Sequence, residues 1–241
     1  YMINLKNKIC LVTGSNGYIG KSICKKLKSL GAKVLETDFK EGKKKTKHFA
    51  FADLNDEDDI NHLYKFAKKL RKIDVLVNNH GYGAADETDK NSFYNDKYLK
   101  LNLDATIKLT EKILPLLKNS RSASIINISS IYGFMAYDEN LYIGTNMITP
   151  MAYGISKGGL IQFSKLLASK LGPKIRVNSL SPGGVFRNQP KKFLRRYILK
   201  TPLKRLANEN EIANGVAFLA SDLSSYITGH NLVIDGGYSI T

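Results

Sequence analysis

The chain has 241 residues, 43% hydrophobic and 24% charged, and a formal net charge of +16. This length supports one large core, and the composition is that of a folded globular protein rather than a disordered chain. No apolar run approaches the ~20 residues that a membrane span needs, which argues against a membrane protein.

Strands and helices are expected to alternate along the chain. Short apolar runs predict strands at 9–12, 33–35, 74–77, 124–128, 175–180 and 232–234. Helical periodicity predicts helices at 18–30, 56–70, 95–117, 152–171 and 209–220. This order predicts an α/β fold in one domain over residues 1–241: a three-layer, doubly wound parallel sheet of the Rossmann type.

The positive charge is mostly lysine, with denser clusters at 40–47 and 191–200. No zinc-finger spacing or RNP-like aromatic motif accompanies them. We interpret the clusters as a solvated basic surface, with anionic small molecules as the alternative, and expect no nucleic-acid partner. The two cysteines, Cys10 and Cys24, fall in a predicted strand and a predicted helix. We interpret both as buried or half-buried apolar side chains of a protein in a reducing compartment. With no signal-peptide pattern we expect a cytoplasmic location, and the scattered histidines predict no metal site.

A glycine-rich turn from Thr13 to Gly20 joins the first strand to the first helix. Its glycines recur at intervals of three, which permits a tight turn and leaves the helix N-terminus open to a pyrophosphate. The turn therefore predicts dinucleotide binding. The residues expected at the cofactor are Gly14, Asn16, Gly17, Tyr18, Ile19 and Gly20.

The choice of dinucleotide depends on the end of the second strand. Asp38 stands where a carboxylate hydrogen-bonds the adenosine ribose and repels a 2′-phosphate, which predicts NAD in preference to NADP. Lys40 and Lys43 lie just beyond and soften this repulsion. Asp53 and Leu54 follow an apolar stretch, at the expected position of the adenine edge.

A tyrosine and a lysine four residues apart, Tyr153 and Lys157, share one face of a predicted helix. The ammonium and a positive nicotinamide ring both favour the phenolate, so we expect the pKa of Tyr153 to be lowered from its usual value near ~10. Ser130 ends the preceding strand and can hydrogen-bond the reacting oxygen. Tyr64 and Lys68 have the same spacing, but on a helix that only covers the sheet.

The sequence resembles the short-chain dehydrogenases/reductases over essentially its whole length. The motifs that carry the resemblance are Thr13-Gly14 to Gly20, Asp53-Leu54, Asn78-Asn79-His80-Gly81, Asn102, Ser130, Tyr153-x-x-x-Lys157, Ser181-Pro182-Gly183 and Ile234-Asp235-Gly236-Gly237. The resemblance implies a catalytic tetrad of Asn102, Ser130, Tyr153 and Lys157. We interpret Asn102, inside the predicted long helix, as passing a proton through water to Lys157, with a polar residue bonded to the backbone as the alternative. It implies a homotetramer or homodimer. It also adds cofactor contacts at Asn79, Gly81, Pro182, Gly183 and Val185, beside Tyr153 and Lys157.

The chain departs from the family pattern in four places. The glycine spacing is that of the family's sugar-nucleotide-modifying branch, whereas the remaining motifs belong to its small single-domain branch. His80 stands where alanine is usual, and we interpret it as tolerated variation. Arg187 takes the place of a threonine. The stretch 131–152 is longer than usual and, together with Ser181 to Phe186, is similar to oxidoreductases of bacterial flagellin-modification and nonulosonic acid pathways.

The family places a substrate lid where residues 184–205 lie in this chain. As a helix, this segment turns its apolar residues to the site and its arginines to the rim. We hypothesise a substrate that bears a phosphate or another anion, with Arg187 on the cofactor's pyrophosphate and a merely solvated basic helix as alternatives. The candidate substrate residues are Tyr142, Asn146, Arg187 and Arg195.

These observations predict an NAD(P)-dependent oxidoreductase that transfers a hydride between nicotinamide and an alcohol or carbonyl. The narrower similarity points to an amino-sugar or sugar nucleotide of bacterial surface glycan synthesis. The alternatives are a 3-oxoacyl-thioester reductase, with the basic surface docking an acidic carrier protein, and a non-catalytic nucleotide-sensing protein on the same fold.

Overall fold

A parallel sheet forms the centre of the molecule. The computed structural model describes residues 3–39, 47–83 and 95–241, so Lys40 and Lys43 lie outside the described residues. The strands are β1 (Ile9–Thr13), β2 (Lys33–Asp38), β3 (Phe49–Phe51), β4 (Val75–Asn78), β5 (Ala123–Ile128), β6 (Ile175–Pro182) and β7 (Asn231–Ile234). Within the described part of the chain they form one seven-stranded sheet in the order β3-β2-β1-β4-β5-β6-β7, with every neighbouring pair parallel.

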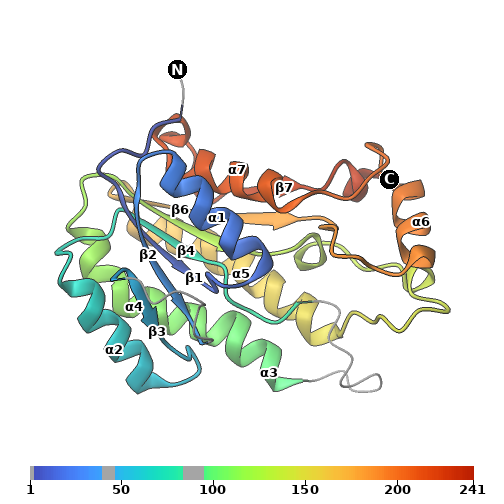
Figure 1. Cartoon of the computed structure of the whole chain (residues 1–241), viewed down its shortest axis with the longest axis horizontal. Helices are drawn as coiled ribbons and strands as arrows, with labels where there is room; N and C mark the ends of the chain where they lie inside the picture. Colours follow the sequence, from blue (N-terminus) through green and yellow to red (C-terminus); the bar gives the residue numbers. More distant parts are fainter. Residues whose placement is uncertain (1–2, 40–46, 84–94) are drawn as a thin grey trace.

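Helices cover both faces of this sheet, as the predicted three-layer fold requires (Figure 1). The longer helices are α1 (Tyr18–Ser29), α2 (Glu57–Lys68), α4 (Ala105–Lys118), α5 (Met151–Leu171), α6 (Lys191–Lys200) and α7 (Glu209–Ala220). Successive strand residues point to opposite faces. Accordingly, Val12 packs in the core under α1 and α7, whereas Leu11 packs in the core under α2, α4 and α5. No described helix is both long enough and apolar enough to pass through a lipid bilayer.

Local sequence signals fix where these helices begin. The Asp56 side chain accepts a hydrogen bond from the Asp59 amide and caps α2. Asn208 and Glu211 form a reciprocal capping box at the start of α7. Such caps satisfy amides that have no partner in the first helical turn. Both helices therefore begin within a residue of the predicted position.

Two elements differ from the sequence prediction. The single helix predicted over 95–117 is instead α3 (Asp96–Tyr98), a π-helical stretch η1 (Leu99–Asp104) and α4. The spacing of apolar residues does not reveal the π-helical turn, because the helical pattern of apolar residues continues in α4 directly after it. Strand β3 was not predicted, since three residues with one buried side chain are too short to show an alternating pattern.

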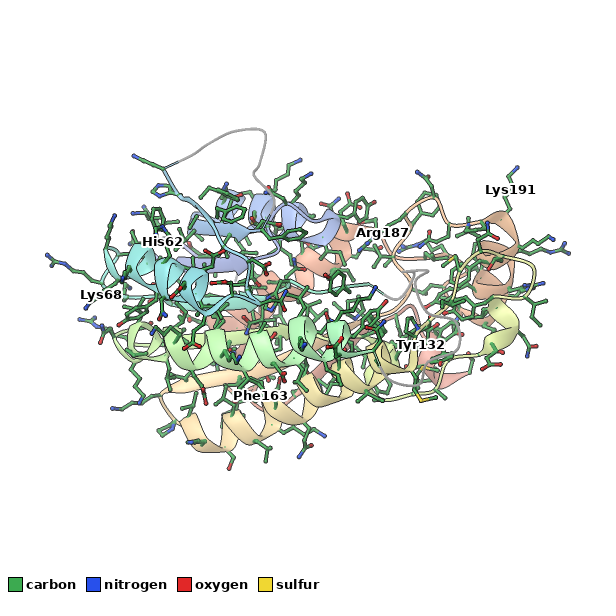
Figure 2. All side chains as sticks on the ribbon, turned by 90° about the horizontal axis from the view of Figure 1, so that it is seen from below. His62, Lys68, Tyr132, Phe163, Arg187 and Lys191 are labelled. Carbon is green, nitrogen blue, oxygen red and sulfur yellow. The ribbon has the colours of Figure 1, made fainter. Side chains whose placement is uncertain are left out.

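The order of the strands reverses between β1 and β4, which places a crevice at their carboxyl ends. The turn after β1 meets the segments that follow β4, β5 and β6 there. Two short 3₁₀ turns, η2 (Ile131–Gly133) and η3 (Glu139–Leu141), lie in the long segment after β5, and η3 packs with α6. In Figure 2, Tyr132 and Arg187 lie toward the end of the molecule that carries Lys191 of α6, whereas His62 and Lys68 of α2 lie at the opposite end.

Candidate active site

A cavity of about 970 Å³ opens at the carboxyl ends of the strands. All the residues that the sequence predicted at the cofactor line it. They are Gly14, Asn16, Gly17, Tyr18, Ile19, Gly20, Asp38, Asp53, Leu54, Asn79, Gly81, Tyr153, Lys157, Pro182, Gly183 and Val185. One continuous cavity therefore joins the glycine-rich turn to the predicted catalytic pair.

The glycine-rich turn has the shape of a phosphate cradle. Gly14 has φ +60°, and a Cβ there would lie 2.8 Å from the His80 Cα. A Cβ at Gly20 would lie 2.0 Å from the Gly14 carbonyl oxygen, so a side chain at either position would force the backbone apart. Helix α1 starts after Gly17 with no side-chain cap and no acidic residue in its first turn. Its first amides therefore suit a pyrophosphate, and the turn fits a dinucleotide.

Asn79 fixes this turn from the neighbouring strand. Its side-chain amide donates to the Thr13 and Gly14 carbonyl oxygens, at 3.0 Å each. Asp38, which is buried at the end of β2, accepts the Asn16 amide at 2.9 Å. Asp38 therefore places a carboxylate on the cavity wall beside the glycine-rich turn.

The predicted catalytic side chains come together on one wall of the cavity. Ser130 follows β5, and Tyr153 and Lys157 lie one helical turn apart on α5, with all three side chains buried. The Lys157 ammonium donates to the Ile128 carbonyl oxygen at 2.8 Å and lies 5.8 Å from the centre of the Tyr153 ring. Burial lowers the pKa of Lys157 to about 8.

The pKa of Tyr153 differs from the expectation. Burial raises the Tyr153 pKa, while a hydrogen bond with Ser130 and the charge of Arg187 lower it, and the net direction is upward. The sequence prediction of a lowered pKa counted the attraction of Lys157 and of the nicotinamide cation but left out the loss of hydration. The chain's own groups therefore do not lower this pKa by themselves.

Asn102 lies behind the cavity wall, in the π-helical stretch. Its Oδ1 accepts the Tyr82 amide at 2.8 Å, and its Nδ2 donates to the Ser156 hydroxyl at 3.1 Å. A Cβ added to Gly81 would lie 2.7 Å from the Asn102 Oδ1 and 3.7 Å from the Lys157 Nζ. Asn102 and Lys157 thus both border Gly81, so the structure brings Asn102 up to the other predicted catalytic residues.

The far end of the cavity is lined by aromatic rings and hydroxyl groups. The Tyr142 hydroxyl bonds to the Tyr132 hydroxyl at 3.0 Å and to the Thr149 hydroxyl at 2.6 Å. Phe193 and Tyr197 of α6 close this end, with the apolar face of α6 turned inward as predicted. Tyr132 and Thr149 were missed, because no spacing pattern connects them before the chain folds.

The candidate substrate residues have different outcomes. Tyr142 and Arg187 line the cavity, and the Arg187 guanidinium lies 5.1 Å from the centre of the Tyr18 ring. Asn146 and Arg195 are exposed and are not among the residues that line the cavity, so the structure does not bring them together with the other candidates. Arg195 lies on the outer face of α6, because Phe193, two positions before it, occupies the inner face.

The fold and the cavity together define a dinucleotide-dependent oxidoreductase of the Rossmann type. A family model described as "Enoyl-(Acyl carrier protein) reductase" matches residues 14–239. A 7alpha-hydroxysteroid dehydrogenase of Bacteroides fragilis is 32% identical over 99% of this chain and 97% of its own length. A post-translational flagellin modification protein A of Campylobacter coli is 31% identical over 98% and 100% of the two chains.

Two further comparisons agree with these. A 3-oxoacyl-(acyl-carrier-protein) reductase FabG of Aquifex aeolicus is 32% identical over 98% of both chains. The crystal structure of a short-chain dehydrogenase from Leptospira borgpetersenii with bound NAD⁺ superposes with a TM-score of 0.87 at 33% identity, covering 97% of this chain and 93% of the other. The chain belongs to the short-chain dehydrogenase/reductase family and is an NAD(P)-dependent oxidoreductase.

Proposed function

We propose that this protein uses NAD(H) to interconvert an alcohol and a carbonyl on an anionic sugar derivative, such as an amino-sugar or sugar nucleotide. The observation that carries the proposal is the composition of the cavity beyond Tyr153. Hydroxyl groups of Tyr132, Tyr142 and Thr149 form a connected chain there, and Arg187 lines the same cavity.

This surface suits a sugar better than a purely apolar substrate. Sugar hydroxyls need hydrogen-bonding partners, because a buried hydroxyl without one costs about 1–3 kcal/mol. Aromatic rings such as Phe193 and Tyr142 pack against the apolar face of a sugar ring, and Arg187 suits a phosphate. The Campylobacter coli relative, named for flagellin modification, supports a substrate of this kind.

Each residue of the tetrad has a defined task in this proposal. When bound, the nicotinamide supplies or accepts the hydride. Tyr153 gives a proton to the carbonyl oxygen during reduction and takes it back during oxidation, and Ser130 holds that oxygen by a hydrogen bond. Lys157, anchored on the Ile128 carbonyl, would bind the nicotinamide ribose, and its charge would add to that of the nicotinamide cation in favouring the Tyr153 phenolate once the cofactor is bound. Asn102 would relay protons to Lys157 through water.

The test is a substrate screen that follows the NADH absorbance band. Sugar nucleotides, free amino-sugars and neutral alcohols are compared, each with NAD⁺ and with NADP⁺. The proposal predicts the highest kcat/KM for an anionic sugar derivative with NAD⁺. A preference for an uncharged substrate would overturn the substrate class, and a preference for NADP⁺ would overturn the cofactor assignment.

A 3-oxoacyl-thioester reductase is the second candidate, favoured by the Aquifex aeolicus relative and by the chain's net charge of +16. An acidic carrier protein would dock on a basic surface by charge complementarity. The two candidates separate in one assay: a 3-oxoacyl thioester on its carrier protein is offered alongside the sugar nucleotides. Faster turnover of the thioester, falling steeply with added salt, would favour the second candidate.

A further inference from the structure

A buried histidine lies between the glycine-rich turn and the π-helical stretch that carries Asn102. The ring of His80 is bonded on both sides: its Nδ1 lies 2.7 Å from the Thr13 hydroxyl, and its Nε2 lies 3.2 Å from the Thr106 hydroxyl. The Thr106 hydroxyl in turn donates to the main-chain carbonyl oxygen of Asn102 at 2.9 Å. His80 thus spans two parts of the site that the sequence places far apart.

The donor and acceptor in each of these hydrogen bonds, from Thr13 to Asn102, can be assigned by counting hydrogens. The Thr13 hydroxyl oxygen accepts the amides of Asn79 and His80, at 3.0 and 3.2 Å, so its single hydrogen is left to donate. The nearer acceptor is the His80 Nδ1, since the Val77 carbonyl is 3.3 Å away. With Nδ1 accepting, Nε2 carries the hydrogen and donates to Thr106, whose own hydrogen goes to Asn102.

The surroundings of the ring agree with this neutral form. Burial, followed by the charge of Lys157, lowers the pKa of His80 to about 3, although a hydrogen bond with the Leu101 backbone raises it, so the ring carries one hydrogen at neutral pH. The three assigned hydrogen bonds all point the same way: Thr13 donates to His80, His80 donates to Thr106, and Thr106 donates to the Asn102 carbonyl. Removing the ring would leave the Thr106 hydroxyl without its donor.

We propose that His80 is a positioning residue that sets the main chain at Asn102 relative to the dinucleotide turn. Asn102 is then fixed on two sides: the Tyr82 amide and the Ser156 hydroxyl hold its side chain, and Thr106 holds its carbonyl. His80 stands where alanine is usual in the family that the sequence resembles. The kinetic consequence rests on the proposed function, because it requires Asn102 to relay protons to Lys157.

Four variants test the link. His80→Asn keeps an acceptor for Thr13 near the Nδ1 position but loses the donor to Thr106, and His80→Gln places an amide donor near the Nε2 position. Thr106→Val removes the hydroxyl that His80 acts through. Thr110→Val is the matched control, because it removes a buried hydroxyl one turn along α4 that bonds to Asn78 rather than to the site.

The first measurement is hydrogen exchange of the backbone amides by mass spectrometry, which does not need activity. We expect faster exchange over 79–83 and 99–104 in His80→Asn and Thr106→Val, partial recovery in His80→Gln, and no change there in Thr110→Val. Unchanged exchange in His80→Asn and Thr106→Val would overturn the positioning role. The same increase in Thr110→Val would also overturn it, because loss of any buried hydroxyl would then suffice.

The second measurement is turnover. We expect His80→Asn and Thr106→Val each to lower kcat about tenfold, the scale of one lost hydrogen bond, with the Kd for NAD⁺ within about threefold of wild type. The double variant should lose no more than either single variant, because both break one chain. Turnover of His80→Asn within twofold of wild type, or additive losses, would contradict the inference. Absence of turnover in the wild type would instead count against the proposed function, and the exchange data would still decide on His80.

Discussion

Acid should destabilise this protein through His80. In the folded chain its pKa is held at about 3, whereas an unfolded chain has an ordinary histidine pKa near ~6.5. Below the pKa of the unfolded state, histidine binds a proton in the unfolded chain but stays neutral in the folded chain. The free energy of unfolding therefore falls as the pH falls from about 6.5 toward 3. At about pH 5 the free energy of unfolding is lower by about 2 kcal/mol for this reason. The value is nearly the same for any folded pKa well below 5.

Urea unfolding of the wild type and His80→Asn measures this cost. Each protein is unfolded at about pH 7.5 and at about pH 5, and the loss in the free energy of unfolding is compared between the two. The wild type should lose about 2 kcal/mol more than His80→Asn, because asparagine does not titrate and all other groups are shared. Equal losses in the two proteins would show that His80 takes up a proton between about pH 7.5 and about pH 5 as readily in the folded state as in the unfolded state, and would refute the lowered pKa.

Two further predictions concern specificity. Asp38→Asn keeps an acceptor for the Asn16 amide but removes the negative charge, so NADP⁺ should gain about tenfold in affinity relative to NAD⁺ by calorimetry; an unchanged ratio would mean that Asp38 does not select the cofactor. Arg187→Ala should raise the substrate KM about tenfold or more with NAD⁺ affinity intact, whereas Arg195→Ala, on the outer face of α6, should leave KM unchanged. Loss of NAD⁺ affinity in Arg187→Ala would place the guanidinium on the cofactor instead.

Contiguous sequence patterns predicted the sheet and the cofactor wall. Strands such as β4, with four buried residues of which the first three are apolar, appear as short apolar runs because both faces of a parallel sheet are covered. The glycine-rich turn and the Tyr153–Lys157 spacing are local in sequence, so their geometry follows from the elements that carry them. Strand β3 and the π-helical stretch around Asn102 lacked such local patterns and were missed.

Contacts between residues that are far apart along the chain could not be predicted from the sequence. His80 was interpreted as tolerated variation, yet it bonds to Thr13, 67 residues before it, and to Thr106, 26 residues after it. Only the folded sheet, in which β1 and β4 are neighbours, brings these groups together. The place of Arg195, in contrast, follows from local periodicity: a basic residue on an amphipathic helix faces solvent when the apolar face turns inward.

The most direct test of the central claim is the turnover of Tyr153→Phe beside Tyr64→Phe. Both variants remove one hydroxyl from a Tyr-x-x-x-Lys pair, but Tyr64 lies on α2, outside the residues that line the cavity. If Tyr153 is the acid–base, Tyr153→Phe loses about 10²–10⁴-fold in kcat with NAD⁺ affinity nearly unchanged, while Tyr64→Phe keeps wild-type turnover. Turnover of Tyr153→Phe within a few-fold of wild type would contradict the mechanism.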